Sequence, residues 1–270
     1  MVVTPVPVLL YHAVTDEPPA WIAEFTVGPR EFAAQLDAVA ASGRTPVTAG
    51  AFAAALTGQG QLPARPVVLT FDDGFADLQG PTADALAARS LPATAYLTTG
   101  ALTRGAGIPG RGSLLPPAPM MSLTRLVSLE ERGIEIGAHT VTHAQLDTLP
   151  AAALRRELRE SKDVLEDALG HAVDHLAYPH GYSSRAVRTA ARTAGYASAA
   201  AVRHALSSTA DEPFRMARLI LRRSHTAADV AAWMAGEGAR VAPFPDAART
   251  VGWRLYRRAR ARVFGPEFAG

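Results

Sequence analysis

The chain has 270 residues, of which 48% are hydrophobic, and its formal net charge is +2. This length allows one large domain with a complete core, and so small a net charge argues against a nucleic-acid-binding surface. The absence of cysteine excludes disulfides and thiolate metal sites, so a metal ion would have to be bound by His, Asp or Glu.

Short apolar runs alternate with amphipathic segments along most of the chain. In chain order the pattern predicts strand 7–12, helix 29–43, strand 67–71, helix 81–90, strand 93–97, a long loop rich in Gly and Pro at 99–119, helix 122–133, strand 134–139, helix 150–170, strand 174–179, helix 183–195, strand 197–202, strand 215–221 and helix 226–236. Strands that alternate with helices are typical of parallel α/β folds, and seven or eight of them favour a closed or nearly closed barrel. An open doubly wound sheet is the alternative.

No linker or internal repeat divides the chain, so we expect one domain over 1–245 and a basic helical tail over 246–270. The tail is predicted to pack on the domain through Val251, Leu255 and Val263, and contact with an anionic membrane surface is the alternative. The N-terminus lacks the pattern of a signal peptide, and no run of about twenty apolar residues could span a bilayer. We therefore expect a cytoplasmic protein, either free or peripheral at the membrane.

Polar side chains follow several predicted strands, at the edge where chemistry gathers in parallel α/β folds. Asp72 and Asp73 follow strand 67–71, and His139 and His143 follow strand 134–139. Two adjacent carboxylates after a buried strand need a nearby positive charge or a proton. Two histidines four residues apart share one face of a helical turn and suit a common metal ion. The pattern predicts a catalytic metal site in which one Asp is a ligand and the other is free to act as a base.

Neither motif is specific on its own. An Asp-Asp-Gly segment is also common in loops and at helix N-termini, and pairs of histidines at this spacing occur by chance. The prediction depends on both motifs following separate buried strands. His171, His175 and His204 have no comparable context, and we expect them to be ordinary structural or surface residues.

The segments "LTFDDG", "IEIGAHTVTHAQL" and "LAYPHG" together resemble the polysaccharide deacetylase family, the NodB-homology carbohydrate esterases of family 4. The resemblance extends over residues 6 to 236. It implies a distorted (β/α) barrel that removes acetyl groups from N-acetylated carbohydrates with a divalent metal, Zn²⁺ first and Co²⁺ or Ni²⁺ as alternatives. It also implies that Asp72 is the general base and that Asp73, His139 and His143 are the metal ligands.

The catalytic acid of the family usually lies late in the chain, in a Leu-x-His segment. Here "LLYH" near the N-terminus resembles the circularly permuted branch of the family, which includes poly-N-acetylglucosamine deacetylases. On this resemblance His12 is the acid. His225, in "LRRSHTAADV", is the competing candidate. We favour His12 because it directly follows a predicted buried strand.

The third motif departs from the common family form, in which an Arg precedes Pro, Pro and an aromatic residue. Ala177 stands at the position of the Arg, and Tyr178, Pro179 and His180 follow it. Arg218 is our candidate for the missing Arg, with an ordinary surface residue as the alternative. The resemblance implies that Tyr178, Pro179 and His180 bind the substrate and its oxyanion, the latter through the backbone N–H of His180.

Two other functions remain open at this point. The missing motif Arg leaves room for a hydrolase of the same fold that acts on a non-sugar amide or a cyclic imide. An inactive glycan-binding module is the second alternative, although the complete set of catalytic candidates argues against it. The sequence leaves the size of the substrate and the oligomeric state undetermined.

Overall fold

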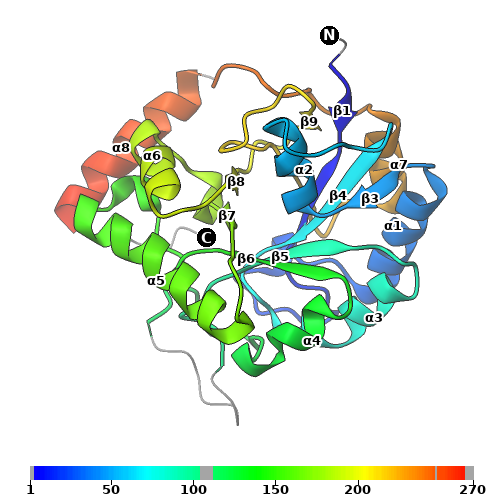
Figure 1. Cartoon of the computed structure of the whole chain (residues 1–270), viewed down its shortest axis with the longest axis horizontal. Coiled ribbons are helices and arrows are strands. Elements are labelled where there is room, and N and C mark those ends of the chain that lie inside the picture. The colour runs from blue at the N-terminus through cyan, green and yellow to red at the C-terminus, as the bar shows by residue number, and fades with distance from the viewer. Residues whose placement is uncertain (1–2, 104–111, 247, 265–270) are drawn as a thin grey trace.

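Seven parallel strands form a curled sheet at the centre of the computed structural model, which describes residues 3–103, 112–246 and 248–264 (Figure 1). The strand order is β10-β2-β4-β5-β6-β7-β8. The strands are β2 (Val8–Tyr11), β4 (Pro66–Phe71), β5 (Ala93–Leu97), β6 (Ile134–Ala138), β7 (His175–Ala177), β8 (Ser198–Ala200) and β10 (Leu219–Ile220). The predicted α/β class and distorted (β/α) barrel are confirmed.

The segment around β10 brings the two ends of the curled sheet together. Leu219 and Ile220 pair in parallel with Leu9 and Leu10 of β2. A few residues earlier, Met216 forms a parallel bridge to Ala200 of β8. The predicted strand 215–221 is therefore split between two neighbours, and only its last part is a regular strand. One consequence is that β2, near the start of the chain, lies beside β10, which follows the other strands in the sequence.

Helices cover the outer face of the sheet (Figure 1). They are α1 (Pro29–Ala41), α3 (Pro81–Ala87), α4 (Leu126–Glu130), α5 (Ala151–Leu169), α6 (Arg185–Thr193) and α7 (Ala227–Ala235). All six were predicted, but α4 is shorter than 122–133 because its first residues form a 3₁₀ turn at Leu123–Arg125. Three short strands were not predicted. β1 (Pro5–Val6) and β9 (Ser207–Ser208) pair with each other, and β3 (Thr45–Val47) pairs in parallel with β4.

Side-chain alternation along β4 decides which residues face the inside of the barrel. Leu69 and Phe71 pack in the outer core against the helices, whereas Val68 belongs to the inner cluster. Thr70 also faces inward, where its hydroxyl donates to Leu9 O. Because successive side chains in a strand point to opposite faces, the position after Phe71 again points inward. Asp72 therefore enters the carboxyl end of the barrel.

The amino end of the barrel is closed by α2 (Ala49–Leu56), which follows the short strand β3 (Thr45–Val47). Phe52 of this helix packs into the inner cluster. Glu135 of β6 accepts hydrogen bonds from the Thr48 hydroxyl and from Gly50 N–H at the start of α2. A carboxylate there also interacts favourably with the helix dipole. This closure leaves the carboxyl end of the barrel open for a site.

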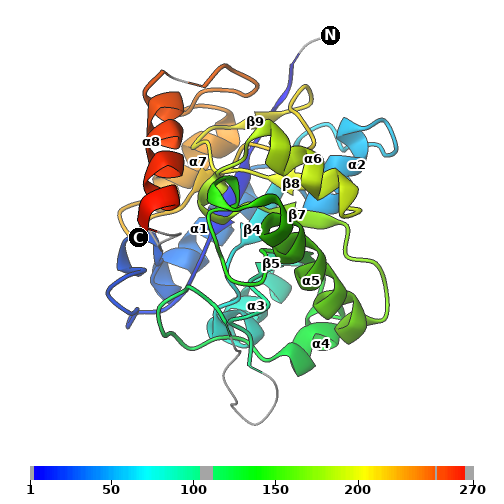
Figure 2. The same cartoon turned by 90° about the vertical axis from the view of Figure 1, so that its left-hand side faces the viewer.

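The basic C-terminal segment forms α8 (Ala248–Phe264) on the outside of the molecule (Figure 2). Leu255 and Val263 are 60% and 72% exposed, so their predicted role as packing contacts is wrong, and the side chain of Val251 lies outside the described residues. Arg257, 5% exposed, anchors the helix instead. In the described part of the chain, every helix is too short or too polar to cross a bilayer.

Candidate active site

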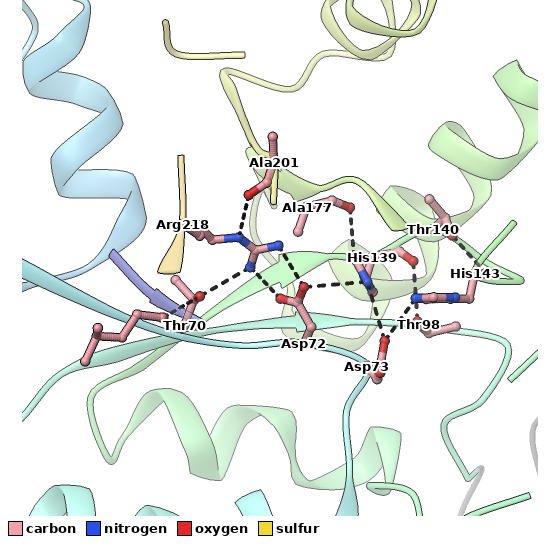
Figure 3. Close-up of polar contacts among 11 residues, drawn as sticks. Thr70, Asp72, Asp73, Thr98, His139, Thr140, His143, Ala177, Ala201 and Arg218 are labelled. Carbon is pink, nitrogen blue, oxygen red and sulfur yellow. Dashed lines mark hydrogen bonds and ion pairs between the residues drawn. The ribbon is translucent and has the colours of Figure 1, made fainter. Parts of the chain in front are cut away.

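A pocket of about 380 Å³ opens at the carboxyl end of the barrel. The side chains at its base come from three strand ends that the sequence analysis singled out, those of β2, β4 and β6, and from the turn after β7. Six predicted site residues line it: His12, Asp72, Asp73, His139, His143 and His180. The structure therefore gathers these residues from distant parts of the chain into one place, as Figure 3 shows for four of them.

Asp73, His139 and His143 lie close enough to share one ion. One potential ligand atom from each of the three lies within 4.8 Å of the other two, and all three residues are buried. Oδ1 of Asp73 is 3.4 Å from Nε2 of His139 and 3.2 Å from Nε2 of His143. This buried oxygen accepts no hydrogen bond within the described part of the chain. A buried carboxylate oxygen between two imidazole nitrogens is the arrangement expected of metal ligands.

The tautomer of His139 is fixed by its other ring nitrogen. Nδ1 lies 2.8 Å from Ala177 O, and because a carbonyl oxygen only accepts, Nδ1 carries the proton. Nε2 then presents a lone pair toward Asp73, and a backbone carbonyl that orients a ligating histidine in this way is common in metal sites. Burial lowers the pKa of His139 to about 4, so the ring is neutral near pH 7 and suited to bind a cation.

Asp72 is held by Arg218, which the sequence analysis had proposed as the missing motif Arg. Nη1 and Nη2 of Arg218 donate to Oδ1 and Oδ2 of Asp72 at 2.7 and 2.8 Å, a bidentate ion pair (Figure 3). Arg218 is 0% exposed, so it is not a surface residue. Its Nε donates to Ala201 O and its Nη1 also contacts the Thr70 hydroxyl. The guanidinium is thus fixed from three sides and fixes the carboxylate in turn.

The charge of Asp72 follows from these contacts. Burial alone raises the pKa of a carboxyl group, but here Arg218 and His139 outweigh burial and hold the pKa of Asp72 below its ordinary value. For Asp73, burial is likewise outweighed by the neighbouring imidazoles, and its pKa lies well below its ordinary value. Both adjacent carboxylates are therefore ionised near neutral pH, and Arg218 balances the charge of Asp72.

Three of the site residues have left-handed backbones, with φ of 72° at Asp73, 65° at His143 and 56° at His180. Such conformations cost free energy in residues other than glycine and concentrate at functional sites. At Asp73 this backbone ends the regular alternation of β4, which allows two consecutive carboxylates to approach the same pocket. Gly181 next to His180 also has positive φ, and a Cβ there would lie 2.3 Å from Val202 N, so the turn requires glycine.

The loop between His139 and His143 is held by a residue that the sequence analysis missed. Glu157 of α5, 4% exposed, accepts hydrogen bonds from the backbone N–H groups of Val141 and Thr142 and from the Thr142 hydroxyl. Its position in the amphipathic pattern of α5 gave no signal, because glutamate is common on helices. Glu157 therefore fixes the backbone between the two histidines through its hydrogen bonds to Val141 and Thr142.

His12 and His225 occupy different environments. His12 lines the pocket at the end of β2, with its ring 5.7 Å from that of Phe25. Burial lowers the pKa of His12, and the carboxylates of Asp73 and Asp72 oppose that shift. His225 is not among the residues that line the pocket, and its Nδ1 accepts a hydrogen bond from Arg222 N–H. The pocket therefore contains only one of the two candidate acids.

Of the three motif residues Tyr178, Pro179 and His180, only His180 is among the residues that line the pocket. The hydroxyl of Tyr178, which is 0% exposed, donates to Phe214 O, away from the pocket lining. Pro179 is also buried and does not line the pocket. His180 does line it, and burial lowers its pKa to about 3, so its ring is neutral. Tyr178 and Pro179 therefore shape the turn that presents His180.

The wall of the pocket consists of residues that no sequence motif marked. Trp21, Ile22, Phe25 and Leu115 contribute apolar surface, and Arg203, His204 and Arg222 contribute polar and basic groups. These side chains come from irregular segments and a short 3₁₀ turn, where neither helix nor strand periodicity marks a residue as part of a site. A pocket with apolar and aromatic walls and a few polar groups at its base is typical of small-molecule sites.

Helix α8 reaches this pocket through Tyr182. Arg257 pairs with Asp147 at 3.1 Å and donates to Gln145 Oε1 at 2.7 Å, in the segment that follows His143. Its guanidinium also lies 3.5 Å from the ring centroid of Tyr182, which stacks on His180. The C-terminal helix is therefore fixed to the segments that carry His143 and His180.

The comparisons with known proteins agree with this site. The profile of the polysaccharide deacetylase family matches residues 59–199, more than half of the chain. A curated protein, the putative polysaccharide deacetylase YxkH of Bacillus subtilis strain 168, is 22% identical over 190 residues, which are 70% of this chain and 62% of that protein's length. The matched segment contains Asp72, Asp73, His139, His143 and His180 but not His12 or Arg218.

Solved structures share the fold. The Streptococcus pyogenes deacetylase PplD, in complex with acetate, superimposes with a TM-score of 0.75 at 23% identity, over 86% of this chain and 99% of that one. IcaB from Ammonifex degensii superimposes with a TM-score of 0.72 at 23% identity, over 85% of this chain and 97% of that one. From the profile match together with the site described above, we conclude that the chain belongs to the polysaccharide deacetylase family.

Proposed function

We propose that this protein is a metal-dependent deacetylase that hydrolyses the N-acetyl group of an amino sugar and releases acetate. The observation that carries the proposal is the buried set of Asp73, His139 and His143 beside the ionised Asp72 in one pocket. The amino sugar belongs to a polysaccharide, an oligosaccharide or a glycoconjugate. Membership of the deacetylase family supports the reaction type, and the pocket supports the participation of a metal.

Asp73, His139 and His143 would hold the metal ion. Two imidazoles and one carboxylate suit Zn²⁺, with Co²⁺ and Ni²⁺ as alternatives, and three protein ligands leave positions open for water and substrate. A bound divalent ion in such a site supplies Lewis acidity, which makes water more acidic and a carbonyl more electrophilic. The neutral ring of His139 and the low pKa of Asp73 keep both groups ready to bind a cation.

Asp72 acts as the general base. Its carboxylate faces the pocket, stays ionised near neutral pH and is held in a single orientation by Arg218. It accepts a proton from the attacking water as the water adds to the acetamide carbon. Arg218 contacts neither water nor substrate in this scheme, because it lies buried behind Asp72. Its part is to position the base and keep it charged.

The remaining groups serve the tetrahedral species and its collapse. The backbone N–H of His180 donates to the developing oxyanion, and Tyr178 and Pro179 form the turn that directs it into the pocket. His12 donates a proton to the nitrogen of the departing amino sugar, and acetate remains. Burial lowers the pKa of His12, and the carboxylates of Asp73 and Asp72 oppose that shift and favour the protonated ring that this step requires. The pocket holds about one sugar unit in this scheme, and the apolar walls around Trp21 and Phe25 contact the sugar ring.

The other functions carry less support. A hydrolase of a non-sugar amide or a cyclic imide would keep the same site, but the pairing of Arg218 with Asp72 removes the main reason for that alternative. An inactive glycan-binding module would have no need of a buried pair of ionised carboxylates beside the imidazoles of His139 and His143. As a working division of the chain, we propose a deacetylase domain over 1–245 and a basic appendage over 246–270.

Metal removal tests the proposed function directly. We expect acetate release from N-acetylglucosamine oligomers by the purified protein, complete loss of this release after treatment with a chelator, and recovery on adding Zn²⁺. Elemental analysis should find about one metal ion per chain, since the three ligands form one site. Acetate release that persists at the same rate in metal-free protein would contradict the proposal, as would a metal-loaded protein inert toward every N-acetylated sugar tested.

A pair of matched variants tests which histidine is the acid. His12→Gln is expected to lower kcat by about 10² to 10³-fold with little change in KM, because it removes proton donation to the leaving amine. His225→Gln, the control, should stay within a few-fold of the wild type because His225 lies outside the pocket lining. Steady-state kinetics on an N-acetylglucosamine oligomer measure both. The reverse pattern would assign the acid to His225.

A further inference from the structure

A second pocket, of about 280 Å³, lies between the first turn of α6 and helix α8. It is separate from the pocket that holds the carboxylates and histidines, and none of its residues has a part in the deacetylase scheme. Its lining is unusually basic, with five arginines and one acidic residue. The full lining is Ser183, Ser184, Arg185, Arg188, Arg215, Asp246, Arg254, Leu255 and Arg258.

The acidic residues near this pocket are too few to balance the arginines. Asp246 pairs with Arg254 at 2.7 Å, with Arg215 at 3.0 Å and with Arg203 at 3.4 Å. Outside the lining, Glu212 pairs with Arg215 at 3.3 Å and Asp147 pairs with Arg258 at 3.6 Å. Arg185 and Arg188 take part in no ion pair within residues 3–103, 112–246 and 248–264. The pocket therefore carries a clear excess of positive charge.

Crowding of this kind is unfavourable without an anion. Burial lowers the pKa of Arg188, and the positive charge of Arg215 lowers it further. The buried Nε–H groups of Arg254 and Arg258 have no acceptor in the described part of the chain. Guanidinium groups that lack acceptors cost free energy, and an oxyanion would supply the acceptors and offset the repulsion.

The backbone adds to the same preference. Ser184 caps α6 by accepting a hydrogen bond from Val187 N–H, and the helix is nine residues long. The free N–H groups of the first turn and the helix dipole make the N-terminal end of α6 electropositive. Arg185 and Arg188 lie in this turn. The helix end by itself would not make a site, but here it coincides with the arginine cluster.

We propose that this pocket binds a phosphate group. Five arginines around a small cavity suit a multiply charged group with several acceptor oxygens better than they suit a single carboxylate. The pocket also adjoins the deacetylase pocket, because Ser183 directly follows Tyr182, which lines the latter. Asp246 further links Arg203 of the deacetylase pocket to Arg215 and Arg254. A bound phosphate would thus lie beside the sugar site, and it belongs either to a lipid headgroup or to a soluble phosphate compound.

Inorganic phosphate tests the site itself, whether or not the protein is a deacetylase. Calorimetric titration of the metal-loaded protein should show binding that Arg188→Ala weakens at least ten-fold. Arg159→Ala, which removes an exposed arginine from α5, should leave binding unchanged. Phosphate should raise the Tm of the wild type but not of Arg188→Ala. Without phosphate, Arg188→Ala should melt no lower than the wild type, because it relieves repulsion.

Two results would overturn the proposal. One is equal phosphate affinity in the wild type and in Arg188→Ala, or no binding to either. The other is binding that is lost in His143→Ala but kept in Arg188→Ala, since the phosphate would then occupy the predicted metal site. Phosphate affinity and Tm are measured without acetate release, so the outcome of the deacetylase assay does not affect this test.

Vesicles distinguish the two sources of the phosphate. Phosphatidylcholine vesicles with and without phosphatidic acid are sedimented with the protein. Binding that requires phosphatidic acid, is lost in Arg188→Ala and is displaced by inorganic phosphate assigns a lipid headgroup. Phosphate binding without sedimentation assigns a soluble phosphate compound. Sedimentation that Arg188→Ala leaves unchanged counts against a headgroup in this pocket and attributes the contact to the general charge of α8.

Discussion

Replacing Asp72 by Asn is expected to lower kcat by about 10³-fold while the protein keeps its metal, because general-base catalysis is worth roughly 10² to 10⁴-fold. The Asn side chain has nearly the same shape and still accepts a hydrogen bond from Arg218. It has no carboxylate to take the proton of the attacking water. Acetate release measured alongside the zinc content of the same sample tests both halves of the prediction.

The neighbouring residue provides the matched control. Asp73→Asn makes the same chemical change one position later, where the carboxylate oxygen lies 3.2 Å from His143 Nε2. We expect this variant to lose both metal and activity, and high concentrations of added Zn²⁺ to restore some of each. Activity of Asp72→Asn close to that of the wild type would remove Asp72 from the role of base. Equal metal loss in both variants would mean that the two carboxylates share the ion.

Replacing Arg218 by Met is expected to lower the free energy of unfolding by about 3 to 5 kcal/mol at pH 7, since it breaks a buried ion pair and leaves one charge unpaired. Arg218 is 0% exposed and makes two of its hydrogen bonds to Asp72. Without the guanidinium, Asp72 would be buried as an anion with no partner. Denaturant unfolding of chelator-treated wild type and variant measures the difference.

The pH dependence of this loss has a definite sign. In the wild type the pKa of Asp72 is depressed, so the ion pair stabilises the protein above the unfolded-state pKa, and this stability is lost as the pH falls. In Arg218→Met, burial is left to raise the pKa of Asp72, which favours the folded state only while the carboxyl is protonated. The destabilisation should therefore be largest near pH 7 to 8 and shrink toward pH 4 to 5.

A double-mutant cycle supplies the control for Arg218. Asp72→Asn in the background of Arg218→Met removes the unpaired charge, so the double variant should be more stable than Arg218→Met alone. Additive changes in the free energy of unfolding would mean that the ion pair contributes nothing to stability. The same conclusion would follow if Arg218→Met unfolded at the same denaturant concentration as the wild type at pH 7. The variant Arg218→Lys should recover only part of the stability lost in Arg218→Met, because lysine cannot form the bidentate pair.

Local patterns made much of the fold and of the pocket base predictable. Buried strands with inward and outward alternation, followed by amphipathic helices, identify βα units from neighbouring residues alone. Asp72, Asp73, His139 and His143 could be proposed because each pair directly follows such a strand. No local pattern marks Arg218, because its role depends on a partner 146 residues away in the sequence. Its contact with Asp72 places it as proposed, while the catalytic roles themselves stay predictions.

The remainder depends on contacts that no local pattern encodes. Helix α2 was missed because "AGAFAAAL" is almost wholly small and apolar and lacks the polar face that marks a surface helix. The tail helix was expected to pack through its apolar residues, but Arg257 forms its buried contact because Asp147 and Gln145 are available on the domain. The division at residue 245 stays a prediction.

The order of the strands also bears on how the protein matures during synthesis. β2 lies between β4 and β10, so the first strand of the barrel acquires its last neighbour only when residues 219 and 220 have been made. Until then a nascent chain has no guanidinium to neutralise Asp72, and the gap beside His12 stays open. Long-range pairing of this kind forms slowly, so ribosome-bound chains that end before Arg218 would lack a finished catalytic centre.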